Sequence, residues 1–249
     1  EIRGLNIKIY TFAGWTEAHA NDVCQRIFAL ARYQLELFGK DVAGDYAVIF
    51  VPSAKNGNRV FGGCGTLGQG FEMDEVTPRR CELFSHRLHH VFNAYDPFGI
   101  RMNKRSGGWF QEATASYYEI KALAALGYYD FEERMAQLKS DYDRERPRCD
   151  AELSRDSIVS LRIQDRAWRY QVLEFLHYKK APLVAYLMDE KMKKETEGRK
   201  DLDGFIRHVY ARHGMKKGQV DLKKELRSFT GLDFSDFFRK YVDGKEELP

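Results

Sequence analysis

The sequence lacks the features that mark membrane proteins and nucleic-acid-binding proteins. No apolar run approaches the roughly 18 residues that a membrane-spanning helix needs, and the N-terminus EIRGLNIKIY is not a signal peptide. The net charge is only +3, and neither a basic block nor an acidic tail stands out. We therefore expect a soluble protein with no transmembrane segment and no nucleic-acid partner. Its compartment stays open, cytoplasmic or periplasmic and secreted. Because the chain starts directly in a strand pattern, we expect a segment of something longer.

Cysteine is scarce and its spacing is irregular. Cys24, Cys64, Cys81 and Cys149 form no C-x-x-C pair, so a zinc site made of cysteines is not expected. A chain of 249 residues with 43% apolar content can bury a large core without disulfides. We expect buried free thiols, although one disulfide is also compatible with the sequence.

Strand patterns are confined to the first third of the chain. Leu5, Ile7 and Ile9 alternate with polar residues, which is the period of a half-buried strand. The run YAVIFV at 46–51 is typical of a central strand, and the glycine-rich stretch 59–70 can hold an edge strand. About three strands are thus expected, together with a long helix over 17–38 whose apolar residues recur about every fourth position.

After residue 75 the sequence is helical in pattern. A charged and exposed segment is expected at 131–148. Helices are expected at 77–93, 108–126, 151–160, 166–179, 182–196, 201–213, 221–229 and 233–242. We therefore predict an α+β fold with two parts. Residues 1–75 form a small strand-containing lobe with one long helix, and residues 76–249 form a large helical lobe.

The stretch from Ser85 to Gly99 carries the strongest candidate site. His86 and His90 stand at i and i+4, so on a helix they share one face, as in a zinc-binding H-E-x-x-H helix. Glu112, on the next predicted helix, is available as a third ligand. His89 is a rival ligand but lies on a different face from His86. The glutamate expected after the first histidine is replaced by Arg87.

Several segments resemble one family, in the same order. HRLHHVFN is similar to the H-E-x-x-H-x-W-N motif of the glycyl aminopeptidase family of gluzincin zinc metallopeptidases, and WFQEATASYYE to its W-x-x-E-G-x-x-x-Y-Y segment. SIVSLRIQDRAW, HYKKAPLVAYLMDEKM and GLDFSDFFRKYVDGKEELP resemble its serine–tryptophan stretch, its Y-x-K-G segment with the following helix, and its closing helix. The resemblance covers about residues 45–249 and implies a thermolysin-like catalytic domain. It also implies a PDZ domain after the point where this chain ends.

The resemblance assigns roles to particular residues. It implies His86, His90 and Glu112 as zinc ligands, and Tyr178 as the tyrosine that donates a hydrogen bond to the developing oxyanion. It also implies a peptide or protein ligand. In members of that family, the glutamate of a G-G-x-E motif binds the free amino group of the substrate. Here the corresponding segment is GGCG, so Gly63 is retained and Gly65 replaces that glutamate.

Arg87 changes the chemistry that this constellation can perform. An arginine stays protonated at any working pH, so it cannot accept a proton from zinc-bound water. Two unit charges about 4 Å apart repel by about 4 kcal/mol at an effective dielectric of 20, and a dication roughly doubles this. Arg87 can turn to solvent, or it can pair with Glu112 in place of a metal. Glu82 and Glu119 are further carboxylates that can orient a histidine.

Three interpretations remain at this point. The favoured one is a metallopeptidase-like domain that has lost or nearly lost hydrolysis and serves as a binding or scaffold module. The alternative is an active zinc aminopeptidase in which another carboxylate acts as the base. The third is a helical domain with purely structural histidines, which the number of matching segments disfavours as a statement of ancestry.

Overall fold

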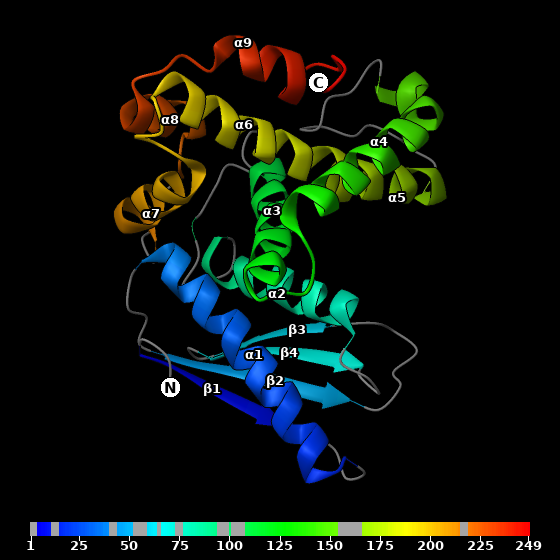
Figure 1. The fold of residues 1–249 in the computed structure, drawn as a ribbon, viewed down its shortest axis with the longest axis vertical. Coiled ribbons are helices and arrows are strands. Elements are labelled where there is room, and N and C mark those ends of the chain that lie inside the picture. The colour runs from blue at the N-terminus through cyan, green and yellow to red at the C-terminus, as the bar shows by residue number, and fades with distance from the viewer. Residues whose placement is uncertain are drawn as a thin grey trace.

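The computed structural model confirms an α+β fold in which helices predominate. It describes residues 4–10, 15–39, 44–51, 59–63, 66–72, 77–93, 100, 108–153, 166–214 and 219–249. The strands form one sheet near one end of the molecule, and most of the helices are stacked beyond it (Figure 1). None of the helices in these ranges is long and apolar enough to cross a membrane.

The sheet has four strands in the order β1-β2-β4-β3. They are β1 (Leu5–Tyr10), β2 (Gly44–Val51), β3 (Arg59–Gly63) and β4 (Thr66–Glu72). β2 pairs in parallel with both β1 and β4, and β3 pairs antiparallel with β4. The glycine-rich stretch expected to hold one edge strand therefore contains two strands. Its glycines hide the alternation by which strands are recognised in a sequence.

Helix α1 (Glu17–Phe38) has the bounds that the sequence predicts and crosses one face of the sheet (Figure 1). The Thr16 side chain caps its first turn by accepting a hydrogen bond from the backbone N–H of His19 at 3.2 Å. Gly39 ends it in the left-handed conformation, with φ of 68°. Its apolar stripe is buried and includes Val23, Ile27, Leu30, Ala31 and Leu35.

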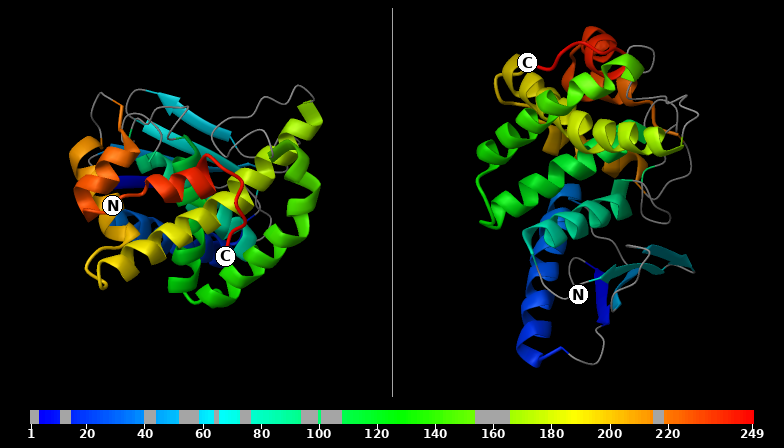
Figure 2. Two further views of the ribbon diagram at one scale, coloured as in Figure 1. Left: turned by 90° about the horizontal axis from the view of Figure 1, so that it is seen from above. Right: turned by 90° about the vertical axis from the view of Figure 1, so that its right-hand side faces the viewer.

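The remaining helices form the larger part of the molecule (Figure 2). They are α2 (Pro78–Asn93), α3 (Gly108–Ala125), α4 (Phe131–Leu153), α5 (Arg166–Phe175), the π-helical turn η1 (Leu176–Lys180), α6 (Ala181–Glu195), α7 (Leu202–His213), α8 (Leu222–Thr230), α9 (Ser235–Phe237) and the π-helical turn η2 (Phe238–Val242). Helices α2 and α3 pack against each other, and α3 also packs against α6.

Helix α4 corrects the sequence prediction for this region. The charged segment expected to be exposed is a helix that begins at Phe131, and the helix expected at 151–160 is represented only by the end of α4, because residues 154–165 lie outside the described ranges. Met135, Leu138 and Tyr142 are buried beneath the charged residues. Their spacing of three and four residues is the helical signal that the high charge content masks.

A buried carboxylate ties three of these helices together. Asp189 on α6 is fully buried and accepts hydrogen bonds from the Tyr117 hydroxyl of α3 at 2.8 Å and from the backbone N–H of Leu202 at the start of α7 at 2.7 Å. Lys193 Nζ lies 2.9 Å from the same carboxylate. Removing one partner from a buried, hydrogen-bonded charge of this kind strongly destabilises a protein.

We expect Asp189→Ala to lower the free energy of unfolding by about 3 kcal/mol, because it leaves the Tyr117 hydroxyl and the Leu202 amide without acceptors inside the protein. Urea denaturation followed by circular dichroism measures this loss. The matched control is Glu190→Ala, which removes a half-exposed carboxylate that pairs with the same Lys193 and costs less than about 1 kcal/mol. Equal effects of the two substitutions would contradict a connecting role for Asp189.

Candidate functional site

Helices α2 and α3 bring His86, His90 and Glu112 together. The Nε2 atoms of the two histidines are 3.0 Å apart. Glu112 Oε2 lies 3.4 Å from Nε2 of His86 and 3.3 Å from Nε2 of His90. Within the described part of the chain, these three residues are the group whose potential ligand atoms all lie within 4.8 Å of one another.

These separations fit a tetrahedral zinc ion. Ligand atoms about 2.0–2.1 Å from a tetrahedral centre are about 3.3–3.4 Å from one another. The three separations between Nε2 of His86, Nε2 of His90 and Oε2 of Glu112 are close to that edge length. Glu112 Oε2 is also buried and forms no hydrogen bond of good geometry with any described residue. A cation bound by all three atoms would satisfy it.

Each histidine is oriented through its other ring nitrogen. Nδ1 of His86 lies 2.9 Å from Glu119 Oε2, and Nδ1 of His90 lies 3.0 Å from Asn93 Oδ1. A carboxylate or amide oxygen at that distance accepts the Nδ1 hydrogen, so Nε2 is the nitrogen that can bind a metal ion once the ring is neutral. Asn93 in turn donates to the backbone carbonyl of Gln111 on α3 at 2.8 Å. The orientation of both rings is thus fixed by the contact between α2 and α3.

Burial and neighbouring carboxylates act on the pKa values in opposite directions. Burial lowers the pKa of His86, but its contacts with Glu112 and Glu119 outweigh burial and raise that pKa to about 9. At His90 burial prevails, and its pKa is lowered despite Glu112. Burial raises the pKa of Glu112, yet its contacts with His86 and His90 hold that pKa well below the usual range. At neutral pH, His86 is therefore an imidazolium beside an ionised Glu112.

Arg87 does not pair with Glu112, which is one of the two arrangements considered from the sequence. Among the described residues, Glu112 forms its ion pairs with His86 and His90 and not with Arg87. The Arg87 side chain is half-buried rather than fully turned to solvent. Its Nε is buried and has no hydrogen-bond partner among the described residues.

The π-helical turn η1 places two further side chains at this site. Tyr178 is 45% exposed, and the centroid of its ring lies 5.6 Å from that of His86. His177 precedes it and is half-buried. Burial lowers the pKa of His177. The charge of Glu112 opposes this shift, and the charges of His86 and His90 add to it. His177 has no counterpart among the residues expected from the sequence, because no motif or spacing singles it out.

Other candidates from the sequence have structural roles. Glu119 orients His86, whereas Glu82 lies 3.3 Å from Nε of Arg134 on α4. His89 is fully buried, stacks on Tyr118 with ring centroids 5.2 Å apart, and pairs with Gln34 of α1. It therefore lies away from the ligand group, as its helical position predicts.

The remaining candidates from the sequence are the glycine segment and the cysteines. Gly63 ends strand β3, and Gly65 and Cys64 lie outside the described residues. Cys24 and Cys81 are free thiols. Cys149 belongs to α4, and the structure does not describe its side chain.

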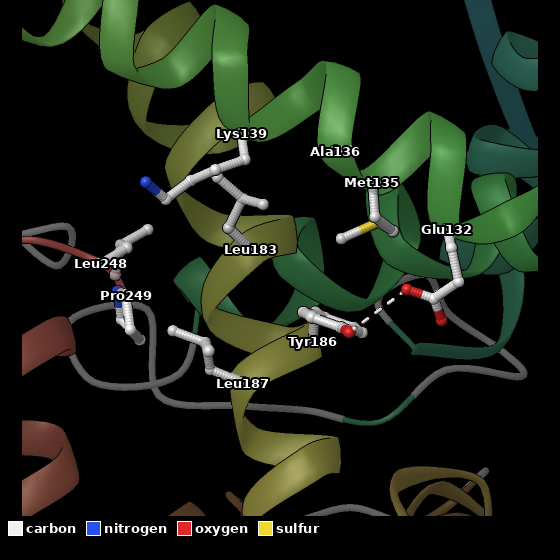
Figure 3. Close-up of a pocket in the computed structure, with 9 residues that line it drawn as sticks. All are labelled: Glu132, Met135, Ala136, Lys139, Leu183, Tyr186, Leu187, Leu248 and Pro249. Carbon is white, nitrogen blue, oxygen red and sulfur yellow. Dashed lines mark hydrogen bonds between the residues drawn. The ribbon is translucent and has the colours of Figure 1, made fainter.

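A separate groove lies between α4 and α6 (Figure 3). It encloses about 200 Å³ and is lined mainly by apolar side chains, with Leu248 and Pro249 at one end. Its polar groups are already engaged: Glu132 accepts from the Tyr186 hydroxyl, and Lys139 pairs with Asp143. The residues that line it include none of the histidine site.

Comparison with known proteins identifies the fold but not a close relative. No family model matches the sequence, and no curated protein matches it. An aminopeptidase N family protein from Idiomarina loihiensis is structurally similar, with a TM-score of 0.73 and 16% sequence identity. The match covers 100% of this chain and 46% of that one.

Two further solved structures agree. Yeast LTA4 hydrolase, in complex with bestatin, matches 99% of this chain and 39% of its own length, with a TM-score of 0.64 and 14% identity. A glutamate-to-alanine mutant of an M1 zinc metallopeptidase from Deinococcus radiodurans, bound to a Tyr-Ser-Ala substrate, matches 96% of this chain and 47% of its own length. Its TM-score is 0.60 at 16% identity. The chain thus spans less than half the length of these proteins, and it shares their fold.

Proposed function

We propose that this chain is a peptide- or protein-binding domain that has the fold of a zinc aminopeptidase and has lost most or all of its hydrolytic activity. The observation that carries the proposal is Arg87. It stands between His86 and His90, at the position where the resemblance to glycyl aminopeptidases calls for a glutamate. In this proposal residues 1–75 and 76–249 are the two lobes of the peptidase fold. A PDZ domain following in the full-length chain is part of the same expectation.

We assign His86, His90 and Glu112 as the residues that hold a zinc ion. The spacing of their ligand atoms supports this assignment, as do Glu119 and Asn93, which direct both Nε2 atoms inward. Zinc bound there would supply a Lewis acid that polarises a carbonyl oxygen. Tyr178 then provides a hydroxyl that can donate to an oxygen of the ligand.

The site as we assign it lacks a proton acceptor. A guanidinium has five N–H donors and no acceptor, and it stays charged at any working pH. The nearby carboxylates have other tasks, since Glu119 holds His86 and Glu82 pairs with Arg134. The resemblance also places Gly65 where a glutamate would grip the amino group of a substrate. A site that holds peptide but neither activates water nor fixes an N-terminus is suited to binding.

One observation favours a second candidate, an active peptidase with a different base. His177 lies in the same turn as Tyr178, and because burial lowers its pKa it is neutral at pH 7 and can accept a proton. In this candidate His177 would take over the task that a glutamate performs in the related enzymes.

Zinc binding should release a proton at neutral pH. Zinc binds the neutral imidazole, whereas His86 has a pKa of about 9. Below that pKa the proton must leave, so the apparent zinc affinity should rise about tenfold per pH unit from pH 7 and level off above about pH 9. Calorimetry in buffers with different ionisation enthalpies counts the protons. Zinc binding without proton release, or binding that survives in His90→Ala, would contradict the assigned ligands.

Hydrolysis should be absent until a base is restored. We expect zinc-loaded protein to leave Tyr-Ser-Ala intact, and Arg87→Glu to raise release of the N-terminal residue by on the order of 10²-fold, the lower end of what a general base contributes. Chromatography of the products measures the rate. Arg79→Glu makes the same charge change at an exposed position of α2 and should have no effect. Chelator-sensitive release by the unaltered protein that persists in Arg87→Gln would overturn the proposal.

The two candidates differ in the response to His177→Asn. Under the second candidate the unaltered protein is active, and this substitution lowers its rate by about 10²- to 10⁴-fold. Under the favoured proposal both proteins remain at background. His208→Asn is the control, because His208 pairs with Glu225 between α7 and α8. The same assay with zinc-loaded protein decides between the candidates.

A further inference from the structure

We propose that Arg87 makes this site a receptor for a free carboxylate, such as the C-terminus of a short peptide. The inference rests on the proposed function, in which the site binds peptides without cutting them. It goes further by naming the group on the ligand that is recognised and the residue that recognises it.

The position of Arg87 on α2 places it beside the zinc-ligand face. Successive residues of an α-helix are rotated by about 100°, so three residues rotate by about 300°, which is about 60° short of a full turn. Arg87 therefore lies nearly one turn before His90, on a neighbouring face of the helix. Every residue from Phe84 to Asn93 is buried except Arg87. Over this part of α2, Arg87 is therefore the side chain that reaches toward solvent next to the two histidines.

Arg87 also has an unsatisfied hydrogen-bond donor. Its Nε is buried and finds no acceptor among the described residues. The carboxylates of the site are bound elsewhere: Glu112 contacts both histidines, and Glu119 contacts His86. An arginine N–H removed from water without an acceptor is costly. A ligand carboxylate that binds the half-exposed guanidinium would let the side chain turn, so that this N–H also gains an acceptor.

The charge of the site favours an anion over a cation. Arginine in place of glutamate raises the local formal charge by two, and a zinc ion on the three ligands adds further positive charge. A free peptide carboxylate is attracted to such a site, whereas a free amino group is repelled. The guanidinium fork matches the two oxygens of a carboxylate.

Two side chains of the site besides Arg87 are partly exposed, those of Glu112 and Tyr178. The Glu112 side chain is 28% exposed, and Tyr178 is nearly half exposed. The hydroxyl of Tyr178 can donate a second hydrogen bond to a ligand oxygen near His86. A ligand carboxylate would thus be met by donors from α2 and η1.

Isothermal titration calorimetry of the zinc-loaded protein tests the inference with two matched probes, Tyr-Ser-Ala and its C-terminal amide. We expect the acid to bind about tenfold to a hundredfold more tightly than the amide. Arg87→Gln should remove this preference, and Arg87→Lys should retain part of it. Arg79→Gln, an exposed arginine of the same helix, should leave it unchanged. Circular dichroism and thermal melts of each variant establish that it is folded.

The outcomes separate this inference from the proposed function. Equal binding of acid and amide, unaffected by Arg87→Gln, would overturn the carboxylate receptor and leave a peptide-binding domain in place. Binding of neither probe would also overturn it. Inorganic phosphate that binds more tightly than Tyr-Ser-Ala would show that the site prefers a different anion. Cleavage of the probes during the titration would instead contradict the proposed loss of hydrolysis.

Discussion

The geometry of the site depends on two hydrogen bonds that point away from it. An imidazole has two ring nitrogens, so fixing one of them determines the direction of the other. Glu119 holds Nδ1 of His86, and Asn93 holds Nδ1 of His90, which turns both Nε2 atoms toward Glu112. Because Glu112 and Glu119 lie on the same helix, two turns apart, α3 supplies a third potential ligand and also orients the first. The same packing of α2 on α3 that stabilises the two helices therefore also holds the side chains of the site in position.

The packing of α2 on α3 orients the two histidines without any general base beside them. The residue after His86 plays no part in orienting either ring, so a substitution there can abolish proton transfer and leave the ligand geometry intact. Under the proposed function, Arg87 is such a substitution. The fold would then be retained for binding, because the position of the catalytic glutamate carries a positive instead of a negative charge.

Much of this could be predicted from local patterns, and the rest depends on tertiary contacts. The i, i+4 spacing of His86 and His90 fixes their common face, and the apolar repeat of α1 fixes its bounds. The sequence offers Glu82 and Glu119 as equal partners for a histidine. Only the packing of α2 against α3 and α4 assigns Glu119 to His86 and Glu82 to Arg134. His177 was missed for the same reason, since its place depends on how η1 packs. The helix α4 was missed because its charged residues outnumber the apolar ones that mark its buried side.

The most direct test is a crystal structure of the protein grown with zinc and Tyr-Ser-Ala, with anomalous data collected at the zinc edge. We expect one zinc peak bounded by His86, His90 and Glu112, and an intact tripeptide beside it. A site without a zinc peak would contradict the assigned metal ligands. Electron density for cleaved products would contradict the claim that Arg87 has removed hydrolysis from this fold.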